Sequence, residues 1–102
     1  METRPFGRTG PSFPILSFGA QRIVDEEGCS EQQAVEILNT AIDRGIRYFD
    51  TAWIYSEGQS EQRVGLVAKH RRKEMWIATK TWATGREEAR RQLADSLQRL
   101  NT

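Results

Sequence analysis

Short apolar runs alternate with helical patterns along this chain, and few folds are compatible with that alternation. Residues 46–50 (IRYFD) and 75–80 (MWIATK) are rich in β-branched and aromatic side chains, as buried strands are. Residues 16–20 (LSFGA) form a shorter run of the same kind. Each run precedes a segment with the apolar spacing of an amphipathic helix. Strands that alternate with helices are typical of βαβ units, so we expect an α/β fold with a parallel sheet.

The first predicted helix has the clearest boundaries. Ser30 and Gln33 have the spacing of a capping box, which satisfies free N–H groups at a helix start. Gly45 stands where a glycine commonly ends a helix in the left-handed conformation. Between them, apolar residues recur at helical spacing: Ala34, Ile37, Leu38, Ala41 and Ile42. We therefore predict a helix that begins after Ser30 and ends before Gly45.

Two further helices and a hairpin complete the prediction. The second helix is expected to start at Ser60 and to end in the basic run 69–73. The third is expected to use Thr84 and Glu87 as another capping box. Its apolar stripe comprises Ala89, Leu93, Leu97 and Leu100. Residues 4–16, with a glycine-rich turn at 7–11, predict a small hairpin ahead of the first strand.

Composition excludes several classes of function. The 102 residues include 15 Lys and Arg against 14 Asp and Glu, so the net charge of +1 argues against a nucleic-acid partner. The single cysteine, Cys29, excludes a disulfide framework and a cysteine-rich metal site, so we expect no metal. No apolar run reaches the roughly 18 residues that span a membrane. The N-terminus lacks the apolar core of a secretory signal, and we therefore expect a cytoplasmic protein without a membrane partner.

The predicted sheet is incomplete by itself. Helices on one face of a three-stranded parallel sheet leave the other face bare, whereas parallel sheets are normally covered on both faces. We therefore expect residues 1–102 to be the N-terminal part of one larger domain with a closed sheet. Within it, 4–16 form the hairpin, and 16–45, 46–73 and 75–102 form successive βα units. An exposed apolar face and an open sheet edge also predict self-association of the isolated chain.

Two charged residues stand at the carboxyl ends of predicted strands. Asp50 ends IRYFD and Lys80 ends MWIATK, and α/β folds place their active sites at this edge. A lysine that enters a core must be paired, so Asp50 is the natural partner of Lys80. Tyr55 follows in the loop after Asp50, and a nearby ammonium group favours a tyrosine that gives up its proton. The alternative is a turn aspartate, an exposed strand-end lysine and a loop aromatic that covers the rim.

These residues lie in a stretch that resembles a known family. Residues 45–65, of the form G-I-R-Y-F-D-T-A-x-x-Y-x-x-G-x-S-E-x-x-V-G, are similar to the first signature region of the aldo-keto reductases. MWIATK resembles that family's lysine strand. The resemblance covers essentially the whole chain but only the opening third of the family's usual length. It implies a (β/α)8 barrel that binds NADP(H) and reduces aldehydes and ketones by hydride transfer without a metal.

The resemblance also implies roles for individual residues. Tyr55 would be the proton donor, Lys80 would make its phenol more acidic, and Asp50 would hold Lys80 and contact the nicotinamide side of the cofactor. Gly19, Ala20 and Gln21 match the segment that passes near the nicotinamide ribose. The loops offer three residues as walls of a substrate pocket: Trp53, Ile54 and Trp82. Packing at the rim is an equal alternative for the two tryptophans.

Some parts of the family's machinery have no match in these residues. The family's catalytic histidine ends its fourth strand, and the chain's single histidine, His70, follows the second predicted helix in a basic cluster. The segments that grip the adenosine phosphate also lie elsewhere in the family, so NADP rather than NAD rests on the resemblance. We therefore expect the 102-residue chain alone to be inactive. A non-catalytic member that binds cofactor, or acts as an accessory subunit, is the alternative.

Overall fold

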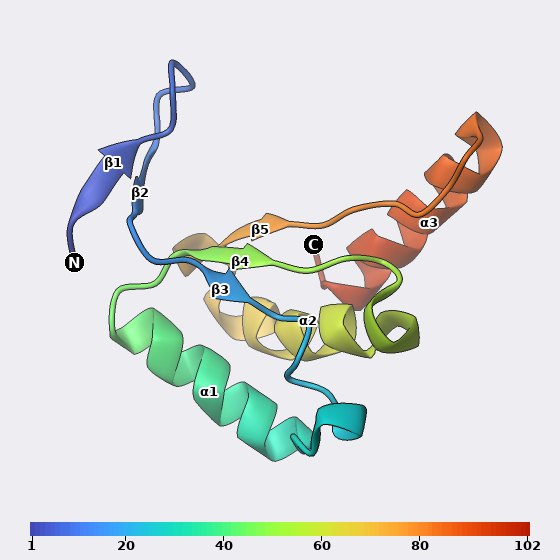
Figure 1. Cartoon of the computed structure of the whole chain (residues 1–102), viewed down its shortest axis with the longest axis horizontal. Coiled ribbons are helices and arrows are strands. Elements are labelled where there is room, and N and C mark those ends of the chain that lie inside the picture. Colours follow the sequence, from blue (N-terminus) through green and yellow to red (C-terminus); the bar gives the residue numbers. More distant parts are fainter.

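The computed structural model describes residues 1–102 as a small parallel sheet with helices on one side and a hairpin at one end (Figure 1). The strands are β1 Thr3–Pro5, β2 Ser12–Pro14, β3 Phe18–Gly19, β4 Tyr48–Asp50 and β5 Trp76–Ala78. The helices are α1 Glu31–Asp43, α2 Gln59–Arg71 and α3 Arg86–Arg99, with short 3-10 turns η1 Asp25–Glu27, η2 Tyr55–Gly58 and η3 Arg72–Glu74. The predicted order, a hairpin followed by three strand–helix pairs, is confirmed.

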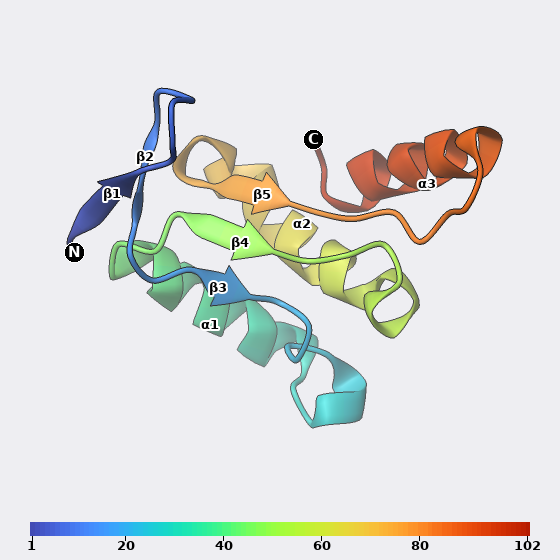
Figure 2. The same cartoon turned by 45° about the horizontal axis from the view of Figure 1, so that its top comes forward.

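The sheet brings the carboxyl ends of three strands into line. β3 pairs with β4 and β4 with β5, both in parallel, in the order β3-β4-β5. The register places Gly19 opposite Asp50, and Asp50 opposite Ala78. Figure 2 shows the three strands side by side with their arrowheads at the same edge. The parallel sheet predicted from the sequence is therefore confirmed, and this edge is where residues from different strands meet.

The core lies between this sheet and the helices α1 and α2. Phe49 of β4, Leu38 and Ile42 of α1, and Val64 of α2 are almost completely buried. The opposite face of the sheet is open, and Trp76, which follows the alternation of β5 onto that face, is 53% exposed. The expectation of one covered and one bare face is therefore confirmed.

The helix starts were predicted with mixed success. Ser30 Oγ accepts a hydrogen bond from Gln33 N, and Gln33 Oε1 accepts one from Ser30 N, which confirms the first capping box. α2 begins at Gln59, one residue before the predicted start, because Gly58 in the left-handed conformation (φ 95°) precedes it. The hydroxyl of Ser60 does not cap the helix and instead donates to Ala20 O.

The second predicted capping box is wrong. α3 begins at Arg86, and Gly85 occupies the N-cap position without any side-chain cap. The apolar stripe of this helix faces solvent, with Leu93 55% and Leu97 45% exposed. The inward side carries Gln92 and Ser96, whereas Leu100, just past the helix, is buried. The helix is predicted correctly, but its inward face is polar.

The hairpin β1–β2 packs against the amino-terminal end of the sheet. The Phe13 ring lies 5.2 Å from the Tyr48 ring and 5.1 Å from the Trp76 ring, in edge-to-face geometry. The Phe6 ring stacks edge-on against Phe13 at 5.2 Å. The hairpin therefore closes the end of the sheet opposite to Asp50. Among the helices, none has the length and apolar character required to cross a membrane.

Candidate active site

Asp50 and Lys80 form an ion pair at the carboxyl edge of the sheet. Lys80 stands two residues beyond β5, and its Nζ donates to Asp50 Oδ2 at 2.8 Å and to Thr51 O at 2.5 Å. The side chains of Lys80 and Asp50 remain 48% and 44% exposed. So exposed a pair adds at most about 1 kcal/mol to stability. Its geometry therefore serves to place an ammonium group at an accessible edge more than to hold the fold together.

Tyr55 lies directly beside this pair. It begins η2, and the Nζ of Lys80 lies 5.2 Å from the centroid of the Tyr55 ring. The next two residues, Ser56 (φ 50°) and Glu57 (φ 55°), are left-handed, which is uncommon outside glycine. This tight turn carries the chain from the strand end straight into α2. The structure therefore brings together all three residues that the sequence proposed for catalysis.

The segment proposed for cofactor binding lies next to Asp50. Gly19 pairs with Asp50 across β3 and β4, and Ala20 N donates to Asp50 O at 2.8 Å. Ala20 is fully buried, whereas Gly19 and Gln21 are exposed. A Cβ placed on Gly19 would meet no atom within 4 Å, so the backbone here is open to an approaching molecule.

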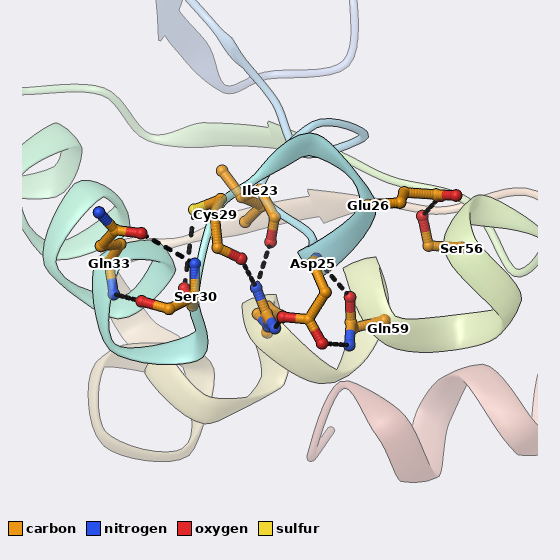
Figure 3. Close-up of polar contacts among 9 residues, drawn as sticks. Ile23, Asp25, Glu26, Cys29, Ser30, Gln33, Ser56 and Gln59 are labelled. Atoms are coloured by element: carbon orange, nitrogen blue, oxygen red, sulfur yellow. Dashed lines mark hydrogen bonds and ion pairs between the residues drawn. The ribbon is translucent and has the colours of Figure 1, made fainter.

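Arg63 of α2 holds the loop that follows Gln21 through contacts with Ile23, Asp25 and Cys29, three residues that Figure 3 labels. Its guanidinium donates to Ile23 O at 3.0 Å and to Cys29 O at 2.7 Å, and pairs with Asp25 at 2.5 Å. Gln59 adds a two-point contact to Asp25, donating to Oδ2 and accepting from the backbone N–H. The Arg63 guanidinium, assisted by Gln59, holds the pKa of the Asp25 carboxyl below its usual value of 3.8.

The three residues proposed for a substrate pocket divide into two groups. Trp53 is half-buried, and its Nε1 donates to Asp95 Oδ2 at 3.1 Å, which ties it to α3. Trp82 is 69% exposed and Ile54 is 39% exposed. Trp53 therefore contacts α3, whereas the side chains of Ile54 and Trp82 are exposed, and a substrate-pocket role for all three stays a prediction.

A buried polar network beneath the site was not predicted. Glu61 of α2 is completely buried and accepts hydrogen bonds from Thr79 and Arg99. Thr51 Oγ1 and Ser60 Oγ lie 2.7 Å apart, and because Ser60 gives its proton to Ala20 O, Thr51 is the donor to Ser60. One signal was available in the sequence. Glu61 lies three residues before Val64, on the face of α2 that must be buried, and a carboxylate there requires partners.

Two chemically capable side chains lie away from the site. His70 is exposed near the end of α2, at the amino-terminal end of the strands, so it stands apart from Asp50 as the sequence suggested. Cys29 Sγ lies 3.6 Å from Ser30 O, at the start of α1. The structure has no group of three or more His, Cys, Asp or Glu side chains placed to hold a metal ion.

Comparison with known proteins identifies relatives over nearly the whole chain. Residues 15–102 match the model of the aldo/keto reductase family. The uncharacterized oxidoreductase YqkF of Bacillus subtilis is 40% identical over 90 residues, which are 85% of this chain and 28% of the relative. The aldehyde reductase YPR1 of Saccharomyces cerevisiae is 37% identical over 95 residues, which are 90% of this chain and 28% of the relative.

Solved structures share the fold as well. The thermostable aldo-keto reductase Tm1743 superposes on all of this chain with a TM-score of 0.86 and 34% identity, over 39% of its own length. An aldo-keto reductase of Klebsiella pneumoniae solved with NADPH has a TM-score of 0.77 and 28% identity, over 89% of this chain and 32% of its own. The chain thus spans between about a quarter and two fifths of the length of these proteins. Its fold is part of their (β/α)8 barrel, and by sequence and by fold it belongs to the aldo/keto reductase family.

Proposed function

We propose that residues 1–102 form the opening βα units of an NADP(H)-dependent carbonyl reductase, with 16–45, 46–73 and 75–102 as successive units. The observation that carries the proposal is the meeting of Asp50, Tyr55 and Lys80 at one edge of the sheet. Support also comes from relatives described as oxidoreductases and as an aldehyde reductase. The substrate class that follows is a small aldehyde or ketone.

The edge beside Asp50 is compatible with a nicotinamide cofactor. The free space beside the Gly19 backbone and the exposed Gln21 leave room for a ring to approach the sheet edge. Asp50 uses Oδ2 for Lys80 and keeps its side chain 44% exposed, so it can accept a further hydrogen bond. Gly19, Ala20, Gln21 and Asp50 would hold the nicotinamide end, and NADPH would supply the hydride for the carbonyl carbon.

The chain's own residues would manage the proton. Tyr55 donates its phenolic proton to the carbonyl oxygen as the carbonyl is reduced. Lys80 stabilises the phenolate that remains, because its ammonium lies against the Tyr55 ring. Asp50 and Thr51 O fix that ammonium from the other side. The exposed Ile54 and Trp82 would contact the apolar part of the substrate.

The 102 residues by themselves are proposed to be inactive. Three βα units cannot close an eight-stranded barrel, which usually takes about 250 residues. Without the remaining units, a substrate beside Asp50 and Lys80 would face solvent at the open carboxyl edge of the sheet. The test compares the chain alone with a completed barrel, in which residues 1–102 are joined to the remaining units of the Tm1743 reductase.

The assay follows loss of NADPH absorbance with 4-nitrobenzaldehyde. We expect turnover by the completed barrel and none by the 102-residue chain. Tyr55→Phe in the completed barrel should abolish turnover and leave the NADPH dissociation constant unchanged. Normal turnover by Tyr55→Phe would remove Tyr55 as proton donor. A folded completed barrel that binds NADPH without turnover would instead favour the non-catalytic, accessory alternative.

A further inference from the structure

Glu61 is a fully buried carboxylate for which the proposed reaction has no direct use. It lies on α2, beneath the carboxyl edge of the sheet, with no exposed surface. Its Oε2 accepts from Thr79 Oγ1 at 2.8 Å, and its Oε1 accepts from Arg99 Nη1 at 3.0 Å. A buried charge persists only where such partners satisfy it, and removal of one partner is costly. Glu61 is therefore held by two residues, Thr79 and Arg99.

The contact with Thr79 connects Glu61 to Lys80. Thr79 immediately precedes Lys80, and the two side chains bind different partners. Thr79 turns toward α2 and Glu61, whereas Lys80 turns to Asp50. The bond from Thr79 to Glu61 therefore fixes the backbone from which the Lys80 side chain extends.

The contact with Arg99 connects Glu61 to the backbone of Lys80 through Trp53. Arg99 donates to Trp53 O at 3.0 Å as well as to Glu61, and its guanidinium lies 5.5 Å from the Trp53 ring centroid. Trp53 N in turn donates to Lys80 O at 3.0 Å. The Trp53 peptide, two residues before Tyr55, is thus held between Arg99 and Lys80. Glu61 and Arg99 join the backbones that carry Tyr55 and Lys80.

We propose that Glu61 is a positioning residue for Lys80 and Tyr55, acting through Thr79 and Arg99. The inference rests on the proposed function, because it assigns the network a task in that site. The alternative is a network that only stabilises the packing of α2 against α3. The two roles predict different results. If Glu61 positions Lys80, a substitution in the network changes the surroundings of Lys80 even where the fold stays intact.

The first test measures the reactivity of Lys80 with acetic anhydride, read by peptide mass spectrometry. The chain has two exposed internal references, Lys69 and Lys73. The experiment uses the 102-residue chain and the completed barrel. In the wild type, Lys80 should react more slowly than both references, because two hydrogen bonds hold its ammonium. Thr79→Val removes the hydroxyl at nearly constant volume. It should raise the acetylation rate of Lys80 about fivefold, which corresponds to the net free energy of one hydrogen bond.

Matched controls separate positioning from general loosening. Thr79→Ser keeps the hydroxyl and should restore the wild-type rate. Thr81 follows Lys80 in the chain, and its hydroxyl binds Gln92 and not Glu61. Thr81→Val removes this hydroxyl and should leave the acetylation rate of Lys80 unchanged. The proposal is overturned if Lys80 reacts as fast as Lys69 and Lys73 in both wild-type proteins. It is also overturned if Thr79→Val leaves the Lys80 rate unchanged.

The second test uses turnover by the completed barrel. Thr79→Val should lower kcat about tenfold through misplacement of Lys80 and Tyr55, with little change in KM for NADPH. Glu61→Gln keeps an acceptor for Thr79 and should retain more activity than Glu61→Leu. Unchanged kcat in Thr79→Val with an active wild type overturns the positioning role alone. An inactive wild type whose Lys80 rate still responds to Thr79→Val overturns the proposed reductase alone.

Discussion

Gly65 offers the sharpest test of how closely α2 and α3 approach. A Cβ added to Gly65 would lie 3.0 Å from both the Arg99 carbonyl carbon and Leu100 Cα, and would overlap the Arg99 carbonyl oxygen. These atoms belong to the backbone, so no side-chain rotation relieves the contact. Asn101 Nδ2 also donates to Gly65 O at 2.9 Å, which ties the same two segments together. Gly65→Ala must therefore push the end of α3 away from α2.

The size of the effect follows from two opposing contributions. Overpacking against a fixed backbone costs up to about 3 kcal/mol. Alanine in a helix interior is favoured over glycine by about 1 kcal/mol. Gly65→Ala should therefore lower the free energy of unfolding of the completed barrel by about 2 kcal/mol. The measurement is the midpoint of a guanidinium chloride titration followed by far-ultraviolet circular dichroism.

A control and a second readout accompany this measurement. Gln62→Ala changes an exposed residue of the same helix and should stay within about 0.5 kcal/mol of the wild type. Because the Arg99 turn moves, Gly65→Ala should also raise the reactivity of Lys80 toward acetic anhydride. Equal or greater stability of Gly65→Ala would refute the close approach of α2 to the end of α3.

Three further outcomes are expected. The pKa of Asp25 is lowered on folding, so its stabilising contribution is complete above its usual value of 3.8 and is lost as the pH falls through the lower folded value. Acid titration of stability should therefore be less steep for Asp25→Asn than for the wild type, and equal slopes would contradict the Arg63 contact. Phe13→Ala should destabilise the protein by about 1–2 kcal/mol, measured by the denaturation midpoint, because the ring joins the hairpin to Tyr48 and Trp76. The 102-residue chain should self-associate through its bare apolar surfaces, and a compact monomer in sedimentation velocity would contradict this.

Local signals predicted the elements of this fold well. The reciprocal hydrogen bonds of Ser30 and Gln33 connect residues three positions apart, so the local sequence is enough to predict them. The same pattern at Thr84 and Glu87 gave a wrong prediction, because α3 begins after Gly85. A capping box needs both the residues and a backbone that turns at the right place. Loop 79–85 instead has its turn set by tertiary contacts such as Trp82 N to Gln92 Oε1.

The candidate site was predictable in part for a similar reason. Asp50, Tyr55 and Lys80 were identified because strand ends and a family resemblance both point to them. Their supporting residues come from distant segments: Arg99 reaches Glu61 across 38 positions in the chain. No local sequence pattern around Arg99 or Glu61 predicts their contact. Similarly, the exposed stripe of α3 satisfies helical periodicity, which predicts a helix without specifying which side will be covered.

The hairpin has a consequence for the engineering of this protein. Its exposed tip, residues 7–10, lies at the end of the sheet opposite to Asp50 and Lys80 (Figure 1). Exposed loop tips with small residues are the sites at which proteins best accept insertions. A purification tag or fluorophore placed in this turn would be anchored by the aromatic contacts of Phe13 and would project away from the candidate site. Surface immobilisation through the hairpin would then leave the carboxyl edge of the sheet facing the solution.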